Sequence, residues 1–338
     1  MTLNTAVGVV VVGRNEGENL RVAIQSALAH RVPVVYVDSG SVDDSVEIAR
    51  SMGIEVLPLD PAIPFTAPRA YNEGVERLQA IAPHIQFVQF LDGDAEFMPE
   101  WIPNAYKAMQ QNLEVAVVCG RRRERHPQAS VYNLIADVEW DTAIGFVDAC
   151  GPESMMRLSM FQQVNGFDTT LIAGEEPEIC FRIRQAGGKV LRIDADSAWH
   201  DMGMTSFWVW WKRSRRGGHA FAEEAWIHRH HPARYRFREC ARIWLWAFIL
   251  PIVALAPAPW TGGQSLWLLP IGYSLYLIKN YLWALKHRQY SPPKALTYAV
   301  FYLLMKFAKW HGQAEFLWLK LRNRRRGLME YQEKKQVI

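Results

Sequence analysis

The amino-terminal third of the chain carries short, almost wholly apolar runs that alternate with segments of helical periodicity. The runs lie at residues 7–12, 34–37, 54–57, 86–91 and 115–118, and the helical segments include residues 18–29 and 70–82. A run that is apolar at nearly every position is typical of a strand buried on both faces. Because parallel strands are usually joined by a helix, the alternation predicts an α/β fold, Rossmann-like, with a mostly parallel sheet and helices on both faces.

Polar residues follow three of these runs, at the point where each predicted strand ends. The segments are Arg14-Asn15-Glu16, Asp38-Ser39-Gly40-Ser41 and Asp92-Gly93-Asp94. The carboxyl ends of parallel strands meet at one rim of the sheet, where ligands of such folds bind. Asp92 and Asp94 together suit a hard divalent cation that also holds substrate phosphates. Asp38 suits a hydrogen bond to a base or ribose. An ordinary turn is the alternative interpretation of Asp-Gly-Asp taken alone.

The chain lacks the common phosphate-binding loops. No Gly-x-Gly-x-x-Gly follows the first predicted strand, and no Gly-x-x-x-x-Gly-Lys-Ser/Thr occurs anywhere. These absences argue against a dinucleotide-dependent oxidoreductase and a P-loop kinase. An acidic rim repels a nucleoside diphosphate unless a cation lies between them. Binding of a diphosphate at this rim therefore requires the predicted metal ion.

In this order the segments resemble the nucleotide-sugar half of the family 2 glycosyltransferases, which have the GT-A fold. A fourth segment, Arg69-Ala70-Tyr71-Asn72-Glu73-Gly74, completes the resemblance, which covers residues 5–220. The resemblance implies transfer of a sugar from a nucleoside diphosphate donor, with Mg²⁺ or Mn²⁺ and inversion at the anomeric carbon. The residues it assigns to donor binding are Arg14, Asn15, Glu16, Asp38, Ser39, Gly40, Arg69, Asn72, Asp92 and Gly93. The metal ligands it assigns are Asp94 and Asp92.

A second acidic segment, Glu175-Glu176-Pro177-Glu178, resembles the acidic pair that opens a helix in this family. The resemblance makes Glu176 the base that activates the acceptor, with Glu175 as the alternative. The family usually carries Asp at the second position, and Glu176 is longer by one methylene. Ordinary helix capping is the competing interpretation, because a Pro in the first turn and acidic residues at the amino end both favour a helix start.

Two further groups complete the predicted site by resemblance. His200 follows the predicted strand 189–193 and is assigned as a third metal ligand, although a lone His is often structural. Arg213 and Arg216 lie in the basic and aromatic segment 210–219, which resembles the segment that covers the diphosphate in membrane-bound members. A juxtamembrane basic patch is the alternative for that segment.

Residues 124–160 are predicted to shape the acceptor pocket, with Asp141 or Glu153 in contact with the acceptor. The adjacent arginine cluster 121–125 is interpreted either as a phosphate-neutralising group or as a solvated loop. The four cysteines, which are widely spaced and form no Cys-x-x-Cys, indicate reduced thiols.

The second half of the chain predicts a membrane attachment. Residues 243–278 are 36 residues without a charge, interrupted by Pro251, Pro257 and Pro259 and by a Gly-Gly turn. Two antiparallel transmembrane helices, about 243–260 and 266–285, fit this stretch. Arg236, Arg238 and Arg242 precede it, and Lys286, His287 and Arg288 follow it. The positive-inside rule then places the catalytic domain on the cytoplasmic side of a bacterial inner membrane. A large apolar soluble domain is the alternative.

The third apolar stretch, 295–321, contains charged residues at helical spacing and predicts an amphipathic helix at the membrane interface. A basic tail, 320–326, suits anionic lipid headgroups. Nucleic acid binding is not predicted, because no recognition module accompanies these charges. The predicted domains are therefore a GT-A domain at 1–220, a basic linker at 221–242 and a membrane region at 243–338.

The sequence thus predicts a membrane-attached, metal-dependent glycosyltransferase. Its acceptor is predicted to be a lipid-linked saccharide in polysaccharide biosynthesis, because the chain resembles exopolysaccharide-assembly members of the family, which also makes polysaccharide-assembly proteins possible partners. Direct transfer to polyprenyl phosphate, a nucleotidyltransferase and a non-enzymatic assembly scaffold remain as alternatives.

Overall fold

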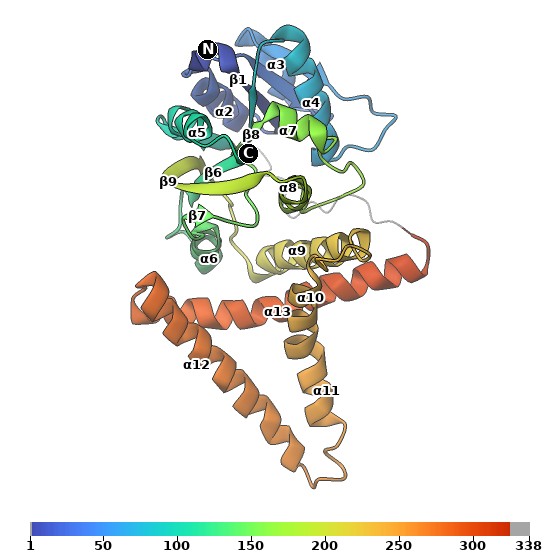
Figure 1. Cartoon of the computed structure of the whole chain (residues 1–338). Helices are drawn as coiled ribbons and strands as arrows, with labels where there is room; N and C mark the ends of the chain where they lie inside the picture. Colours follow the sequence, from blue (N-terminus) through green and yellow to red (C-terminus); the bar gives the residue numbers. More distant parts are fainter. Residues whose placement is uncertain (1, 325–338) are drawn as a thin grey trace. The chain divides into compact units, whose positions relative to one another are not determined.

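The computed structural model describes residues 2–324 and divides the chain into two compact units (Figure 1). The first unit comprises residues 1–127 and 139–202, and the second comprises residues 128–138 and 203–338. The main division therefore follows residue 202, whereas the sequence analysis placed the end of the catalytic domain at 220. Arg325 and Arg326 of the predicted basic tail lie outside the described residues.

One mixed sheet organises the first unit. Its strands are β1 (Val7–Gly13), β2 (Val34–Asp38), β3 (Glu55–Pro58), β4 (Phe87–Asp92), β5 (Ala95–Phe97), β6 (Val115–Glu124), β7 (Gly145–Phe146), β8 (Ser154–Arg157) and β9 (Lys189–His200). Their order is β3-β2-β1-β4-β8-β6-β9-β5, and β7 pairs with β9. The pairs among β3, β2, β1 and β4 are parallel, as predicted, and β6 is parallel to β9. Strand β8, which the sequence analysis did not predict, is antiparallel to both of its neighbours.

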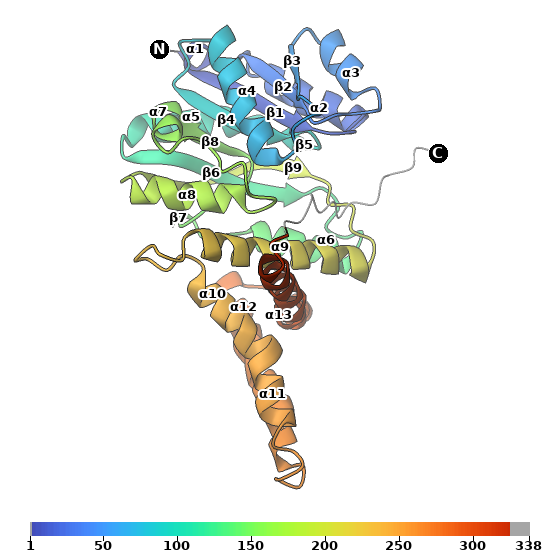
Figure 2. The ribbon, with the colours of Figure 1, turned by 90° about the vertical axis from the view of Figure 1, so that its right-hand side faces the viewer.

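Helices cover both faces of this sheet. They are α1 (Leu3–Ala6), α2 (Glu18–Leu28), α3 (Ser45–Ser51), α4 (Ala67–Ile81), α5 (Trp101–Gln111), α7 (Leu158–Gln163) and α8 (Glu175–Gln185). Figures 1 and 2 show α2 and α5 on one side of the sheet and α4, α7 and α8 on the other. Alternate strand residues enter two separate cores: Val9 and Val11 join the α2 and α5 side, whereas Val10 joins the α4 side. The two-sided burial explains why β1 is apolar throughout.

The second unit is helical in its described part. Its helices are α6 (Val131–Trp140, as far as residue 138), α9 (Phe207–Ile227), α10 (Phe237–Trp244), a π-helical turn (Leu245–Ile249), α11 (Leu250–Leu255), a 3₁₀ turn (Gln264–Trp267), α12 (Leu268–Arg288) and α13 (Pro292–Leu321). Helices α9 and α13 pack with their backbones in close approach, at Gly218 and Gly312. A two-pronged ion pair between Arg215 and Glu315, with N–O distances of 2.9 and 2.7 Å, joins the same two helices.

The two predicted membrane spans do not appear as spanning helices. Within residues 2–324, no helix combines the length and the apolar character that crossing a bilayer requires. The first predicted span is divided among the end of α10, the π-helical turn and α11, which ends at Leu255. The second lies mostly on α12, where Lys279, Asn280 and several tyrosines lower the mean hydropathy. The predicted helix 295–321 is present as α13, and its location at a membrane interface stays a prediction.

The close approach of α9 and α13 predicts an asymmetric response of two adjacent glycines. A Cβ at Gly218 would overlap the backbone of Lys309, whereas a Cβ at Gly217 would meet only Lys309 Cε, at 3.8 Å. We expect Gly218→Ala to lower the free energy of unfolding by about 1–3 kcal/mol through overpacking. Gly217→Ala should instead raise it by up to about 1 kcal/mol, because Ala favours a helix more than Gly does.

Urea unfolding of the full chain, followed by circular dichroism, measures both values. Equal effects of the two substitutions would contradict the observed helix crossing.

Candidate active site

The carboxyl ends of β1, β2 and β4 are aligned by the strand register. Gly13 pairs with Asp38, and the preceding Val12 pairs with Asp92. The turn after β4 lies against the end of β1, because a Cβ on Gly93 would lie only 3.2 Å from Gly13 Cα. A side chain at residue 93 would therefore push the two strand ends apart. The rim predicted from the sequence is present, and three of the predicted segments lie on it.

Asp38 uses its carboxylate to shape its own loop. Its oxygens accept hydrogen bonds from the Tyr36 hydroxyl at 2.8 Å, the Gly40 and Ser41 N–H groups at 3.0 and 2.9 Å, and the Ser41 hydroxyl at 2.5 Å. Only 3% of Asp38 is exposed. The loop that it holds presents backbone and hydroxyl groups at the rim. Contact of Asp38 with a base or ribose stays a prediction.

Asn15 ties the loops after β1 and β2 together. Its N–H donates to the Ser41 hydroxyl at 2.9 Å, and its side-chain oxygen accepts the Val42 N–H at 2.8 Å. On the other side of the loop, the Arg14 guanidinium lies over the Phe65 ring, 5.8 Å from its centre. These contacts fix the shape of the rim before any ligand is bound.

Asp92, Asp94 and His200 bring three metal-ligating side chains together. One ligand atom from each lies within 4.8 Å of the others. The Nε2 atom of His200 is 3.2 Å from an Asp94 oxygen. The register places them there, because Ala95 of β5 pairs with His200 at the end of β9.

The donor set fits a divalent cation. His200 is only 3% exposed, and its buried Nδ1 atom has no hydrogen-bond partner among residues 2–324, so the ring is held largely by packing. The edge of the Trp140 ring lies against it, with the ring centres 5.6 Å apart. Two carboxylates and an imidazole suit Mn²⁺, with further positions left for water and phosphate oxygens.

A largely buried network of polar side chains, which was not predicted from the sequence, holds Asp92. The Tyr71 hydroxyl donates to one Asp92 oxygen at 2.7 Å, and Arg122 donates to the other at 2.7 Å. Arg122 also pairs with Glu153, to which its Nε donates at 2.7 Å, and it lies over the Trp140 ring. Burial raises the pKa of Glu153, and the adjacent Arg122 opposes that shift. The network fixes the orientation of one predicted metal ligand.

The contacts of Arg122 and its neighbours bear on the two interpretations that the sequence left open for the arginine cluster. The cluster 121–125 was interpreted as phosphate-binding or as a solvated loop, yet residues 121–124 form the end of β6. Arg122 is 12% exposed and its charge is directed at Asp92 and Glu153. Three neighbours also pair with carboxylates: Arg121 with Asp141, Arg123 with Asp196 and Arg125 with Glu96. A solvated loop is therefore the wrong description of this segment.

Negative charge accumulates beside the metal-ligating side chains. The Glu16 side chain packs against the turn at Gly93. Burial, and then the charge of Asp94, raises the pKa of Glu16 to about 8. A site that makes a carboxylate this hard to ionise attracts a cation, because a bound cation relieves the same repulsion.

The acidic pair at the start of α8 belongs to the same cluster. Burial, the neighbouring Glu175 and the charge of Asp92 raise the pKa of Glu176 well above its ordinary value. Burial and then the charges of Asp92, Glu176 and Glu175 likewise raise the pKa of Tyr71. The charge of Asp92 contributes to both shifts, so the start of α8 lies within electrostatic range of the end of β4.

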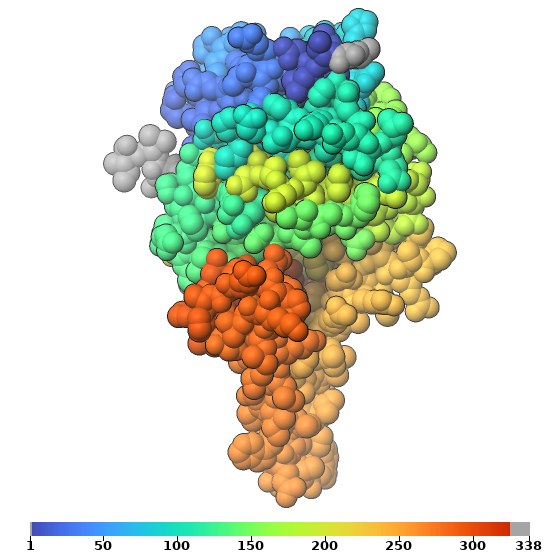
Figure 3. Space-filling view, turned by 60° about the vertical axis from the view of Figure 1, so that its left-hand side comes forward, coloured from blue at the N-terminus to red at the C-terminus, as the bar shows by residue number. Residues whose placement is uncertain are grey.

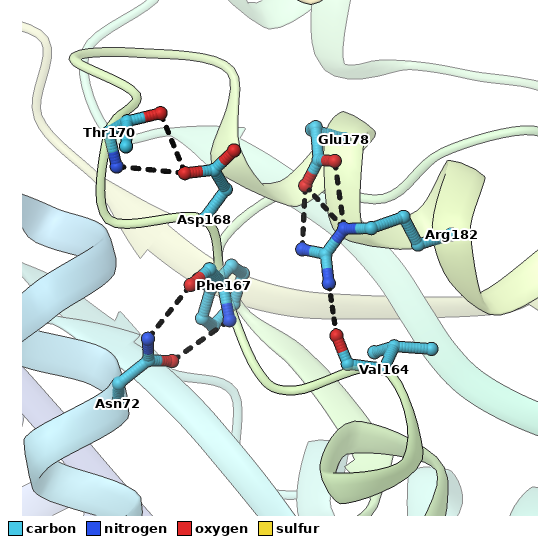
Figure 4. Close-up of polar contacts among 7 residues, drawn as sticks. All are labelled: Asn72, Val164, Phe167, Asp168, Thr170, Glu178 and Arg182. Atoms are coloured by element: carbon cyan, nitrogen blue, oxygen red, sulfur yellow. Dashed lines mark hydrogen bonds and ion pairs between the residues drawn. The ribbon is translucent and has the colours of Figure 1, made fainter. Parts of the chain in front are cut away.

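Two sets of hydrogen bonds position α8, as Figure 4 shows. Asn72 of α4 donates to the Phe167 carbonyl at 2.8 Å and accepts the Phe167 N–H at 2.9 Å. Within α8, the buried Glu178 accepts hydrogen bonds from Arg182, which also donates to the Val164 carbonyl. The beginning of the loop that leads into α8 is thus fixed to α4 through Asn72 and to α8 through Arg182.

The comparisons with known proteins agree with this geometry. Residues 8–160 match the family described as glycosyl transferase family 2. The fold resembles that of the mannosyltransferase PcManGT from Pyrobaculum calidifontis, solved with GDP-Man and Mn²⁺, at 17% identity and a TM-score of 0.62. That match covers 93% of this chain and 87% of the other. Residues 8–160 are therefore similar to glycosyl transferase family 2, and the fold of the chain is GT-A-like.

A second solved structure, residues 1–349 of TarS from S. aureus, is similar to this chain at 12% identity and a TM-score of 0.53. The match covers 93% of this chain and 91% of the other. At these identities the two similarities show the shared fold. A search of curated proteins finds no match.

Other residues assigned to donor binding have structural contacts in the first unit. Arg69 is buried, pairs with Glu73 at 2.6 Å, and donates to the carbonyls of Asp60 and Ile63 at 3.0 and 2.7 Å. The Ser39 N–H donates to the Gly13 carbonyl at 3.1 Å. Their contact with a donor stays a prediction. Arg213 and Arg216 lie on α9 in the second unit, and their contact with phosphate also stays a prediction.

The metal-ligating trio of Asp92, Asp94 and His200 predicts a loss of cation binding in Asp94→Asn. Removing one carboxylate charge should weaken Mn²⁺ binding by about tenfold or more, since even residues outside the ligand shell cost 10–100-fold when changed. Free Mn²⁺, measured by electron paramagnetic resonance with the full chain, gives the affinity directly.

Asp196→Asn is the matched control, because Asp196 lies on the same strand as His200 but pairs with Arg123 and is 37% exposed. Its Mn²⁺ affinity should equal that of the unchanged protein. An unaltered affinity in Asp94→Asn would remove Asp94 from the site.

Proposed function

We propose that this chain is a metal-dependent, inverting glycosyltransferase that uses a nucleoside diphosphate sugar as donor. Its acceptor is a hydroxyl group presented at the membrane, most simply that of a lipid-linked saccharide in polysaccharide synthesis. The chain acts at the cytoplasmic face of a bacterial inner membrane, where polysaccharide-assembly proteins are its natural partners. The observation that carries the reaction is the set of metal-ligating side chains Asp92, Asp94 and His200, with the charge of Asp92 acting on the buried Glu176.

Each part of the reaction has a candidate group. The Glu176 carboxylate takes the proton of the acceptor hydroxyl as that oxygen bonds to the anomeric carbon. The bond from the anomeric carbon to the diphosphate oxygen breaks, and its electron pair leaves with the nucleoside diphosphate. A divalent cation, held by Asp92, Asp94 and His200, supplies charge stabilisation to that leaving group when it is bound. One displacement on the opposite face inverts the configuration without a covalent enzyme intermediate.

The comparisons support the choice of donor and metal. The mannosyltransferase PcManGT was solved with GDP-Man and Mn²⁺ and has a similar fold over most of both chains. The trio in this chain has a donor set that suits the same ion. We therefore propose Mn²⁺, with Mg²⁺ as a substitute, and a nucleotide-linked hexose as donor.

The raised pKa of Glu176 is consistent with a base that works near neutral pH. A carboxyl group of ordinary pKa is ionised but a weak base at pH 7, whereas one with a higher pKa accepts a proton more readily. Burial, Glu175 and Asp92 provide that increase. A cation held at Asp92 would offset part of that increase and so favour the carboxylate form.

Glu176→Gln tests the proposed reaction. Gln keeps the shape of the side chain but cannot accept the proton, so turnover should fall by about 100-fold or more. Binding of the donor should change little, because Gln leaves the metal-ligating trio intact. Released nucleoside diphosphate and calorimetric donor binding, both with Mn²⁺, measure the two properties.

Glu76→Gln, the same change at an exposed position on α4, is the control and should keep full turnover. Full turnover in Glu176→Gln would contradict the assignment and favour a polyprenyl phosphate acceptor, whose phosphate oxygen is already ionised and needs no base. Release of pyrophosphate in place of nucleoside diphosphate would identify a nucleotidyltransferase.

The charge of Glu175 predicts a shift in the pH profile. Activity requires ionised Glu176, so kcat/KM should rise with pH through the raised pKa of that group. Glu175→Gln removes one neighbouring negative charge, lowers the pKa of Glu176 and should move this rise to lower pH. The pH dependence of kcat/KM for both proteins measures the shift. Loss of activity at every pH would instead make Glu175 the base.

A further inference from the structure

The segment 243–278 forms an apolar hairpin in the second unit, with α11 and α12 as its arms. Figure 3 shows the turn end of this hairpin projecting beyond the rest of the second unit on the face drawn. Its inner side is packed: the rings of Trp246 and Tyr276 have centres 4.6 Å apart, and Gly272 lies against Leu250. The two arms therefore form one element, held together by contacts along its inner side.

The outer side of the hairpin is apolar and exposed. Val253 and Leu255 on one arm and Ile271 and Leu275 on the other are between 50% and 62% exposed. Trp260, in the turn, is 84% exposed, and Trp267, at the start of the second arm, is 67% exposed. Soluble proteins rarely expose so continuous an apolar surface, and where they do it marks a site of interaction.

Much of the hydrogen bonding in the turn of the hairpin is internal. Trp260 and Gly263 donate their N–H groups to the carbonyls of Pro257 and Ala258, at 3.0 and 2.9 Å. The hydroxyls of Thr261 and Ser265 donate to backbone carbonyls at 3.0 and 2.7 Å. Pro257 and Pro259 have no N–H group to satisfy. Internal hydrogen bonds of this kind lower the cost of placing the turn in hydrocarbon.

The charges around the hairpin have one sign. The chain carries no Asp or Glu between Glu239 and Glu315, while that interval contains basic residues on α10, α12 and α13. Arg242 precedes the first arm and Lys279 interrupts the second. A second copy of this chain would bring the same positive charges to the contact, whereas anionic lipid headgroups complement them.

The position of the first charge limits how deep the hairpin can reach. Lys279 lies eleven residues after the start of α12 at Leu268. At about 1.5 Å per residue, the uncharged part of this helix is about 17 Å long. The hydrocarbon core of a bilayer is about 30 Å thick, so this length matches one leaflet.

From these observations we propose that the hairpin inserts into a single leaflet of an anionic phospholipid bilayer. The turn with Trp260 and Trp267 then lies in the hydrocarbon, and Arg242 and Lys279 lie at the headgroups of the same leaflet. The hairpin enters and leaves on one side and does not cross. The proposal specifies how the membrane location of the proposed function is achieved, and it is independent of the metal-ligating trio.

Flotation of the full chain with phosphatidylcholine vesicles that contain phosphatidylglycerol tests the insertion. Trp260→Gln and Trp267→Gln should each reduce the vesicle partition coefficient by about tenfold or more, as expected for one buried aromatic side chain. Trp208→Gln is the matched control, because Trp208 of α9 is also 67% exposed but lies outside the hairpin. Equal partition of all three variants would overturn the proposal.

The depth is tested by a cysteine at the turn, in Gln264→Cys. A membrane-impermeant maleimide should label this cysteine in the lipid-free chain. Once the chain is bound to vesicles, the reagent should not label the cysteine, whether it is added outside the vesicles or trapped inside them. The unchanged protein gives the background from its native cysteines. Labelling by the trapped reagent would show a hairpin that crosses, and labelling from outside would show one that does not insert; either result overturns the proposal.

Two outcomes separate this proposal from the others. In the first, the chain fails to float with vesicles and instead forms an oligomer that Trp260→Gln disperses. That result would identify a second copy as the occupant of the hairpin surface and would overturn the lipid assignment. Mn²⁺ affinity should be the same in the tryptophan variants as in the unchanged protein. A failed insertion with intact metal binding and turnover would therefore leave the proposed chemistry standing.

Discussion

The arrangement of the site depends on the fixed carboxylate of Asp92. Tyr71 and Arg122 hold its two oxygens, and Arg122 is held in turn by Glu153. The side chains come from α4, β4, β6 and the segment before β8, so the interaction joins elements that are distant in sequence. Removing one partner of a buried pair of this kind usually costs about 3–5 kcal/mol, because the other charge is left uncompensated.

Without a bound cation, repulsion between the carboxylates of the acidic rim costs free energy. Asp92, Asp94 and Glu16 crowd the end of β4, and α8 adds Glu175 and Glu176. Arg122 compensates only part of this charge. A divalent cation with a bound diphosphate brings both a neutralising charge and new oxygen ligands, which explains why an acidic rim can serve an anionic donor. The repulsion also raises the pKa of the candidate base, so one electrostatic arrangement serves binding and proton transfer.

Much of the first unit follows from local sequence. The strands β1 to β4 and β6 begin within one residue of the predicted runs, because burial on both faces leaves an unmistakable apolar pattern. Asp92, Asp94 and His200 were predicted as ligands, and the structure brings them together. The network around Arg122 was not predictable, since its partners Asp92 and Glu153 lie 30 and 31 residues away. Strand β8 is short and rich in Met, and its antiparallel pairing has no local signal. The structure of the second unit was harder to predict from the sequence. A stretch without charges shows that the segment is apolar but not whether it crosses a bilayer.

The most direct test of the account is the dependence of nucleoside diphosphate binding on Mn²⁺. Thermal unfolding of the full chain can be followed with GDP or UDP, with Mn²⁺, with both, and with both plus a chelator. A ligand that binds the folded state raises the apparent midpoint by mass action. The account predicts a clear rise only when a nucleoside diphosphate and Mn²⁺ are present together, and its loss on chelation. An equal rise with the nucleotide in the presence of chelator would contradict a cation bridge at the acidic rim.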